Sequence, residues 1–227
     1  MNKTLKDMLI GVLLGDAHIG KTGLNKAFIS FEQSNKKSEY LNYLYQLTKE
    51  GGFPLMEDGI KEYSREDSRF NSINKSLYFR TQSLVELKPL SDFFFLNEEG
   101  KKVIPSNIGD HLTDRSLAFW IMDDGQRVKN GGVTLCTDSY KHEEIEILRP
   151  VLKDNFNLSS SIHSKKNNDS FYERIYLNKA NFELFKPSLI PHIHKTMLYK
   201  INEEETIIQD SSNIVDDYSD PNDIFIE

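Results

Sequence analysis

The sequence has little cysteine and no long run of apolar residues. Cys136 is the only cysteine among 227 residues, which excludes an internal disulfide framework and a zinc ribbon or finger built on several cysteines. The longest apolar run, residues 8–14, is far shorter than the roughly 20 residues that span a bilayer, and no signal-peptide pattern precedes it. We therefore expect a soluble intracellular protein without a membrane partner.

Positive charge is also in deficit, because 28 Lys and Arg face 35 Asp and Glu, for a net charge of −7. Residues 203–227 contain nine acids and no lysine or arginine, which leaves 26 acids against 28 bases in residues 1–202. The acidic end has too little periodic apolar content to build a core, so we expect a tail that is disordered or loosely docked. The mildly basic body keeps nucleic acid open as a partner.

The body of the chain contains one pattern of elements twice. Asp16 and Asp124 are 108 residues apart, and the Lys-Pro pairs that begin at Lys88 and Lys186 are 98 apart. Offsets that drift by only a few residues at a time indicate a two-fold internal repeat. The chain is therefore expected to divide into two repeats and the tail, with boundaries at residues 1–108, 109–202 and 203–227.

Hydrophobic periodicity predicts the order α-β-β-α-β-β-α in each repeat, an α+β fold of two pseudo-symmetric units. Helical spacing predicts helices over residues 37–49 and 142–156, and further helices near residues 84–90 and 182–188. Strands are expected near residues 27–33, 59–64 and 76–82 in the first repeat, and near 132–138, 160–164 and 172–178 in the second. The polar stretch 57–74 is expected to form an extended loop or hairpin tip.

Each repeat opens with a short apolar helix that ends in an acid, Asp16 in the first and Asp124 in the second. A carboxylate at a helix C-terminus faces the negative end of the macrodipole, so its charge is locally unfavourable. Gly11 and Gly15 form a flat stripe on the first helix, against which the second can pack closely. Two carboxylates that converge there would repel unless a cation lay between them, and oxygen ligands suit Mg²⁺.

The two helices resemble the paired motifs of the LAGLIDADG homing endonucleases, in the single-chain form with two motifs. The resemblance covers about residues 4–202, and the second copy, Ser-Leu-Ala-Phe-Trp-Ile-Met-Asp-Asp-Gly followed by Thr-Leu-Cys-Thr-Asp-Ser, is close to the yeast mitochondrial intron-encoded branch. It implies motif helices at the interface of two αββαββα units, with antiparallel sheets that form a saddle over double-stranded DNA. It also implies that Asp16 and Asp124 bind Mg²⁺, for which Mn²⁺ substitutes, each helped by the backbone carbonyl of its neighbour, Gly15 or Asp123.

Active sites of that family also carry a basic residue in each half, and the repeat identifies a candidate pair. Lys102 and Lys200 each lie 14 residues after the lysine of a Lys-Pro pair, so they share its offset of 98. Each is expected near the scissile phosphate, where it orients water or stabilises developing charge. The predicted catalytic residues are Asp16, Asp124, Lys102 and Lys200.

Strand alternation predicts a polar face on each sheet that contacts DNA. Arginine can pair with guanine edges and glutamine or asparagine with adenine, while lysine contacts phosphates. We expect Tyr176 to repeat Tyr78, and Asn178 to repeat Arg80. The predicted DNA-contacting residues are Ser30, Glu32, Gln33, Lys36, Lys37, Arg65, Arg69, Lys75, Tyr78, Arg80, Gln82, Asp138, Lys165, Lys166, Arg174, Tyr176 and Asn178. Three of these could also reach the water network of the metal site: Glu32, Gln33 and Asp138.

The sequence therefore favours a monomeric, Mg²⁺-dependent endonuclease that cuts both strands of a long, asymmetric DNA target. The resemblance implies short 3′ overhangs and insertion of the intron that encodes the protein. Two alternatives remain: an RNA-binding group I intron maturase, since the same fold is used in splicing, and a nuclease-inactive DNA-binding protein. Abundant Asn, Lys and Ile hint at an AT-rich organellar genome, so we expect a mitochondrial or chloroplast location.

Overall fold

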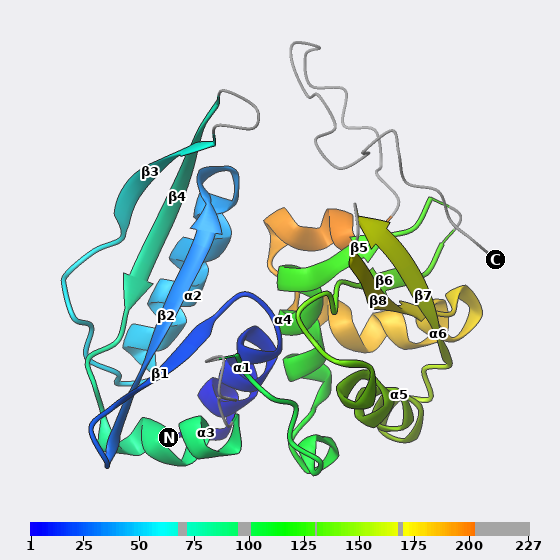
Figure 1. Ribbon diagram of the computed structural model, residues 1–227, viewed down its shortest axis with the longest axis horizontal. Coiled ribbons are helices and arrows are strands. Elements are labelled where there is room, and N and C mark those ends of the chain that lie inside the picture. The colour runs from blue at the N-terminus through cyan, green and yellow to red at the C-terminus, as the bar shows by residue number, and fades with distance from the viewer. Residues whose placement is uncertain (68–71, 95–100, 130, 168–169, 203–227) are drawn as a thin grey trace.

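The two motif helices lie side by side at the centre of the molecule, with a β-sheet on either side (Figure 1). Helix α1 spans Lys3–Leu14 and helix α4 spans Asp114–Asp124. The computed structural model describes residues 1–67, 72–94, 101–129, 131–167 and 170–202. The predicted DNA-contacting residue Arg69 and the acidic tail, residues 203–227, lie outside the described residues.

Both motif helices begin at a capping side chain and are buried along most of their length. The Asn2 side chain accepts from the Leu5 backbone N–H at 2.8 Å, and Thr113 accepts from Ser116 at 3.2 Å, which satisfies donors that a helix N-terminus leaves unpaired. From Met8 to Leu14 every residue of α1 is buried, as is every residue of α4 from Ser116 to Asp123. A helix that is apolar all round is a core helix, and this pair forms the centre of the core.

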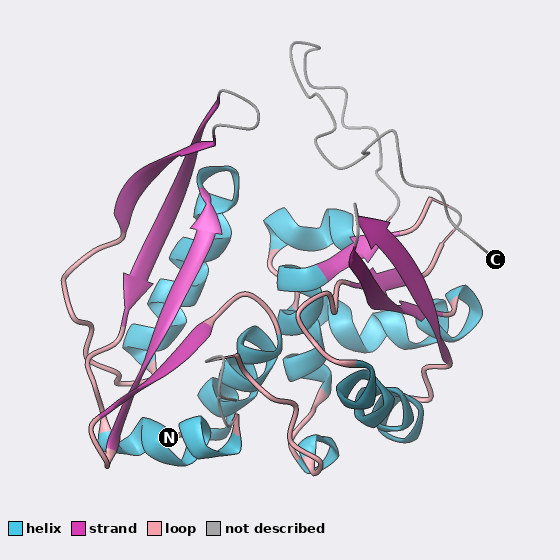
Figure 2. Ribbon diagram, in the orientation of Figure 1, coloured by secondary structure: helices cyan, strands magenta, loops and turns pink. Residues whose placement is uncertain are grey.

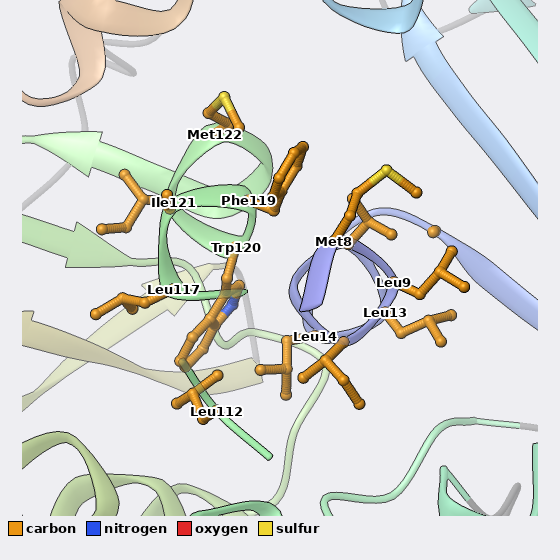
Figure 3. Close-up of a cluster of buried hydrophobic side chains, with 14 of the residues drawn as sticks. Met8, Leu9, Leu13, Leu14, Leu112, Leu117, Phe119, Trp120, Ile121 and Met122 are labelled. Carbon is orange, nitrogen blue, oxygen red and sulfur yellow. The ribbon is translucent and has the colours of Figure 1, made fainter. Parts of the chain in front are cut away.

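Glycines on α1 allow the close approach of α4. A Cβ atom on Gly11 would lie 2.2 Å from the Ser116 carbonyl oxygen, and one on Gly15 would lie 2.5 Å from Asp123 Cβ. Figure 3 shows Phe119 of α4 projecting toward α1. The predicted small-residue stripe is therefore the contact surface between the motif helices.

The first unit carries a four-stranded antiparallel sheet in the order β1-β2-β4-β3. Its strands are β1 (His18–Thr22), β2 (Lys26–Ser34), β3 (Lys61–Asp67) and β4 (Ser72–Arg80). Its helices beyond α1 are α2 (Ser38–Glu50) and α3 (Lys88–Phe93), with short 3₁₀ helices at η1 (Asn35–Lys37) and η2 (Val85–Leu87). Ile29, Phe31 and Phe79 point to the buried side, against α2.

The second unit repeats this arrangement, with strand order β5-β6-β8-β7. Its strands are β5 (Gly125–Arg127), β6 (Val133–Leu135), β7 (Ser160–Asn167) and β8 (Ser170–Leu177). Its helices are α5 (His142–Phe156) and α6 (Lys179–Leu189), with 3₁₀ helices at η3 (Ile108–Asp110), η4 (Ile190–His192) and η5 (Lys195–Lys200). Helices cover one side of each sheet (Figure 2), which confirms the predicted α+β class with two pseudo-symmetric units.

Several predicted elements differ from the structure in extent. The polar stretch 57–74 contains all of β3 and the start of β4, so much of it belongs to a β-hairpin. Strand β6 pairs over Val133–Leu135 only, a shorter span than the predicted 132–138. The helix expected near 84–90 is a 3₁₀ turn followed by α3, which starts at Lys88 with proline in its first turn, where a missing N–H is tolerated. No helix of the described residues is long and apolar enough to cross a membrane.

The register of the sheets corrects one predicted equivalence. Ser30 pairs with Arg80 in the first sheet, and Thr134 pairs with Tyr176 in the second. Ser30 and Thr134 are equivalent because each also pairs with the residue two positions after a motif aspartate. Tyr176 is therefore the counterpart of Arg80. The predictions that Tyr176 repeats Tyr78 and that Asn178 repeats Arg80 are both wrong by two residues, and Asn178 lies beyond the end of β8.

Candidate nuclease site

The two motif helices deliver their acids to one end of the interface. Asp16 and Asp124 both line a pocket of about 410 Å³, together with Lys102. The other lining residues are Gly15, Ala17, His18, Cys136, Asp138 and Ser139. The structure thus brings the two predicted metal ligands and one predicted catalytic lysine to the same cavity.

Each predicted catalytic lysine contacts the end of a motif helix. Lys102 Nζ donates to the carbonyl oxygens of Leu13, Gly15 and Ala17 at 2.6, 2.8 and 2.7 Å. Lys200 Nζ donates to the carbonyl oxygen of Asp123 at 2.8 Å. A cation stabilises the negative end of a helix dipole, so part of the positive charge that the acids require comes from these lysines.

The two lysine contacts are pseudo-symmetric. Gly15 immediately precedes Asp16, and Asp123 immediately precedes Asp124, so each lysine binds the carbonyl next to a motif aspartate. These are the two carbonyls that were predicted to help bind metal. The sequence offset of 98 between Lys102 and Lys200 therefore corresponds to matched positions in space.

Burial and mutual repulsion perturb the ionisable groups of this cluster. Burial, and then the charge of Asp16, raises the pKa of Asp124 to about 7. Burial lowers the pKa of Lys102 to about 8, although the nearby acids oppose the shift, and the pKa of Lys200 is likewise lowered to about 8. Burial also raises the pKa of the Asp123 carboxyl well above its usual range. The site therefore concentrates charged groups where water solvates them poorly, as is common at functional sites.

The oxygen donors of the site suit a hard divalent cation. Asp16 and Asp124 supply carboxylates, and Gly15 and Asp123 supply helix-end carbonyls. Such a set fits Mg²⁺, which keeps several waters and shares its coordination with substrate phosphate. Within the described residues no three His, Cys, Asp or Glu side chains form a complete metal-holding group, so a bound ion would depend on carbonyls, water or substrate.

The Gln33 side chain contacts the carboxylates of Asp16 and Asp123 and does not lie on the polar face of the first sheet. Its Nε2 donates to Asp16 Oδ2 at 2.8 Å and to Asp123 Oδ1 at 3.2 Å. Lys37 is close enough to lower the pKa of Asp124 and of Lys200 by its charge. Both residues were predicted to contact DNA, and Gln33 was also predicted to reach the metal site. The structure places both residues beside the predicted catalytic residues.

The polar face of the first sheet carries a group of mutually bonded side chains. Tyr63 donates to Glu32, and Arg65 donates to the Tyr63 hydroxyl at 2.8 Å. Tyr78 packs edge-on against Tyr63. Arg80 stacks on the Phe28 ring at 3.4 Å and pairs in register with Ser30.

The polar face of the second sheet is organised around an ion pair. Arg174 donates through Nε and a terminal nitrogen to both oxygens of Asp138, each at 2.7 Å, and this bond raises the pKa of Arg174. Tyr176 donates to the Gly131 carbonyl at 3.2 Å and stacks on His163. Lys165 shares this face through the alternation of β7, and Lys166 pairs through its backbone with Phe171.

Four other predicted DNA-contacting residues have different surroundings. Asn178 follows β8 and caps α6, where its side chain accepts from the Ala180 N–H at 3.0 Å. Lys75 lies on the opposite side of β4 from Tyr78 and pairs with Glu62. Gln82 lies beyond β4 and donates to the Leu55 carbonyl at 3.1 Å, and Lys36 belongs to η1, which Ser34 caps. The prediction that Asn178 belongs to the polar face of the second sheet is therefore wrong, because the residue lies beyond β8. The phosphate contact of Lys75 stays a prediction.

Sequence reasoning missed two buried tyrosines that cross the interface between units. Tyr40 of the first unit donates to Asp123 Oδ1 at 2.9 Å, and Tyr140 of the second donates to the Leu14 carbonyl at 2.9 Å. Tyr40 fits the apolar spacing of its helix, which predicts a core residue. A buried tyrosine hydroxyl needs a hydrogen-bond partner, and that requirement was the available indication of a polar role.

Comparisons with known proteins agree with this architecture. The model of the LAGLIDADG DNA endonuclease family matches residues 6–185. A probable intron-encoded endonuclease from Wickerhamomyces canadensis is 32% identical over 88% of this chain and 85% of its own length. A cytochrome b mRNA maturase, bI2, from Debaryomyces hansenii is 28% identical over 88% of this chain and 74% of its own length.

A solved structure is similar throughout most of the chain. It is that of the homing endonuclease I-WcaI bound to its DNA recognition sequence, with a TM-score of 0.77 and 30% identity over 89% of this chain and 88% of that one. The shared fold, the matched motif helices and the extent of the family match lead to one conclusion: the chain belongs to the LAGLIDADG DNA endonuclease family.

Proposed function

We propose that the chain is a site-specific endonuclease that hydrolyses both strands of double-stranded DNA in the presence of Mg²⁺ or Mn²⁺. The observation that carries the proposal is the pseudo-symmetric pairing of Lys102 and Lys200 with the carbonyls beside Asp16 and Asp124. A double-strand break needs chemistry on two phosphates, and this pairing provides an acid and a cation in each unit.

The acids and the lysines of the site have different roles in phosphodiester hydrolysis. Asp16 and Asp124, with the Gly15 and Asp123 carbonyls, would hold the divalent ions. A bound Mg²⁺ supplies Lewis-acid charge at the phosphate and lowers the pKa of a bound water. Lys102 and Lys200 place ammonium groups where negative charge develops on the phosphate oxygens, which stabilises that charge.

The two sheets supply the DNA-binding surface of this proposal. Residues 1–108 and 109–202 act as two half-site domains of a monomer, and their polar faces form a saddle over the duplex. The faces differ in chemistry, since one is centred on Glu32, Tyr63 and Arg65 and the other on the Arg174–Asp138 pair. Different faces read different sequences, so the target is long and asymmetric. Its cleavage leaves short 3′ overhangs, which promote insertion of the intron that encodes the chain.

Cleavage of a randomised duplex library tests the proposal. Wild-type protein with Mg²⁺ should cut a subset of duplexes in both strands, and mapping of the ends should give 3′ overhangs. Asp16→Asn and Asp124→Asn should each abolish double-strand cleavage while the protein still binds DNA in EDTA. Asp92→Asn, at a half-exposed acid on α3, is the matched control and should cut like wild type.

A second candidate function is splicing of a group I intron as an RNA-binding maturase. The observation in its favour is the similarity to the Debaryomyces hansenii maturase over 74% of that protein's length. Tight binding of a group I intron RNA by wild-type protein, without cleavage of any duplex, would replace the nuclease proposal with this one. Relatives named as intron-encoded, with the Asn-, Lys- and Ile-rich composition, support an organellar origin and a mitochondrial or chloroplast location.

A further inference from the structure

Donors from the first unit hold the carboxylate of Asp123, which belongs to the second. Tyr40 OH donates to Oδ1 at 2.9 Å, Gln33 Nε2 donates to Oδ1 at 3.2 Å, and the Asp16 backbone N–H donates to Oδ2 at 3.2 Å. Asp123 is only 5% exposed and Tyr40 is completely buried. The side chain of Asp123 is therefore fixed by groups on the other side of the α1–α4 interface.

The arrangement is one-sided. Asp123 precedes the motif aspartate of α4, and the corresponding residue of α1 is Gly15. A Cβ on Gly15 would lie 2.5 Å from Asp123 Cβ and 2.7 Å from its Oδ2. The carboxylate of α4 thus occupies the space that the glycine of α1 leaves, and the two units contribute unequally to this part of the site.

We propose that Tyr40 is a positioning residue for the Asp16 half of the site and acts through Asp123. The Tyr40 hydroxyl fixes the Asp123 carboxylate, and that carboxylate fixes the backbone of Asp16. Gln33 completes the arrangement because it bonds both acids. The inference rests on the proposed nuclease function, in which Asp16 binds metal.

The Tyr40 hydroxyl remains a donor over the working pH range, since burial and the neighbouring Asp123 raise the pKa of its phenol. Tyr140 provides a matched comparison. It also is buried, at 9% exposure, and its hydroxyl also crosses the interface, to the Leu14 carbonyl at 2.9 Å. Loss of the Tyr140 hydroxyl removes one cross-unit hydrogen bond but releases no carboxylate.

Amide hydrogen exchange in the metal-free, full-length protein tests the contact without reference to cleavage. Tyr40→Phe should speed exchange of the Asp16 amide by about fivefold, the factor that corresponds to loss of one ordinary hydrogen bond. Tyr140→Phe should leave exchange at Asp16 unchanged. Equal exchange at Asp16 in wild type and Tyr40→Phe would overturn the proposal.

Separate nicking rates for the two strands of an end-labelled target duplex, selected from the randomised library, test the consequence. Tyr40→Phe should slow one strand about fivefold more than the other, whereas Tyr140→Phe should keep the wild-type ratio at a similar loss of thermal stability. Slowing of both strands alike in both variants would reduce Tyr40 to a structural role. A wild-type protein that cuts no duplex would refute the nuclease function, and amide exchange would still decide whether Tyr40 positions Asp16.

Discussion

At the scale of single residues, Lys102 offsets the unfavourable position of the Asp16 carboxylate at the negative, C-terminal end of α1. Its ammonium donates to the carbonyls of Leu13 and Gly15, which the helix C-terminus leaves unpaired, and to that of Ala17 just beyond the helix. The charge proposed to act on phosphate therefore also stabilises the fold. Its position was predictable because Lys102 and Lys200 keep one distance from a repeated Lys-Pro pair. Its carbonyl partners were not, because they depend on the path of the chain between α3 and α4.

Replacement of the two lysines should separate these roles. Lys102→Met should lower the free energy of unfolding by about 1–3 kcal/mol, because buried carbonyls lose their donor, and Lys200→Met should lower it less, because one carbonyl is affected. Both variants should lose DNA cleavage. Urea denaturation gives the stabilities, with Lys129→Met in an exposed turn as control. A larger loss of stability in Lys200→Met than in Lys102→Met would contradict this account.

His142 should show a raised pKa. Its Nδ1 lies 2.7 Å from Glu173 Oε2, and this bond raises the pKa above the ordinary 6.5. A raised pKa means that the pair stabilises the fold below pH 6.5 and that this contribution is lost as pH rises through the folded-state value. NMR titration should place the His142 midpoint above 6.5, and Glu173→Gln should return it toward that value. An unshifted midpoint in wild type would show that the pair does not form.

At the scale of elements, local patterning was most informative where an element is long and half-buried. Helices α2 and α5 lie within one residue of their predicted ends. Strands β1 and β5 were not predicted by position, because they have only five and three residues and begin within four residues of the end of an apolar helix. Such short strands show no clear hydrophobic alternation. The register of β8 depends on pairing across the sheet, so an offset read from sequence was wrong by two residues.

The α1–α4 contact predicts unequal tolerance of alanine at two glycines. Gly11→Ala should destabilise the protein by about 1–3 kcal/mol, because its Cβ would meet the Ser116 backbone oxygen at 2.2 Å and the helices would have to separate. Gly51→Ala should cost less, since its Cβ would meet the end of the flexible Leu5 side chain. Thermal or urea unfolding measures both. Equal losses would mean that the helix contact is looser than described.

At the scale of the whole molecule, two units share one core. Buried residues of α1 and α4 belong to a single cluster that extends into both sheets, and Figure 3 shows Phe119 and Trp120 of α4 among its side chains. The sequence offsets between repeated residues predicted the two-fold architecture, because two units with the same backbone fold place equivalent residues at similar spacings along the chain. The cross-unit bonds of Tyr40 and Asp123 were not predictable, because they join residues that differ between the repeats.

A shared core should give a single unfolding transition. Trp120 is the only tryptophan and is completely buried, so its fluorescence reports on the interface, while circular dichroism reports on both units. The two signals should change at the same urea concentration, as in a two-state transition. Separate midpoints would indicate that the units unfold independently.

The bonds around Asp123 also bear on the exchange of halves between related proteins. The natural cut for a chimera lies between the repeats, yet that cut separates Tyr40 and Gln33 from the carboxylate that they hold. A chimera whose first half lacks Tyr40 would leave the Asp123 carboxylate without its hydroxyl donor, and one whose second half lacks Asp123 would leave the Tyr40 hydroxyl without its acceptor. Recombination of target specificities by swapping halves therefore requires that Tyr40, Gln33 and Asp123 be inherited as one set.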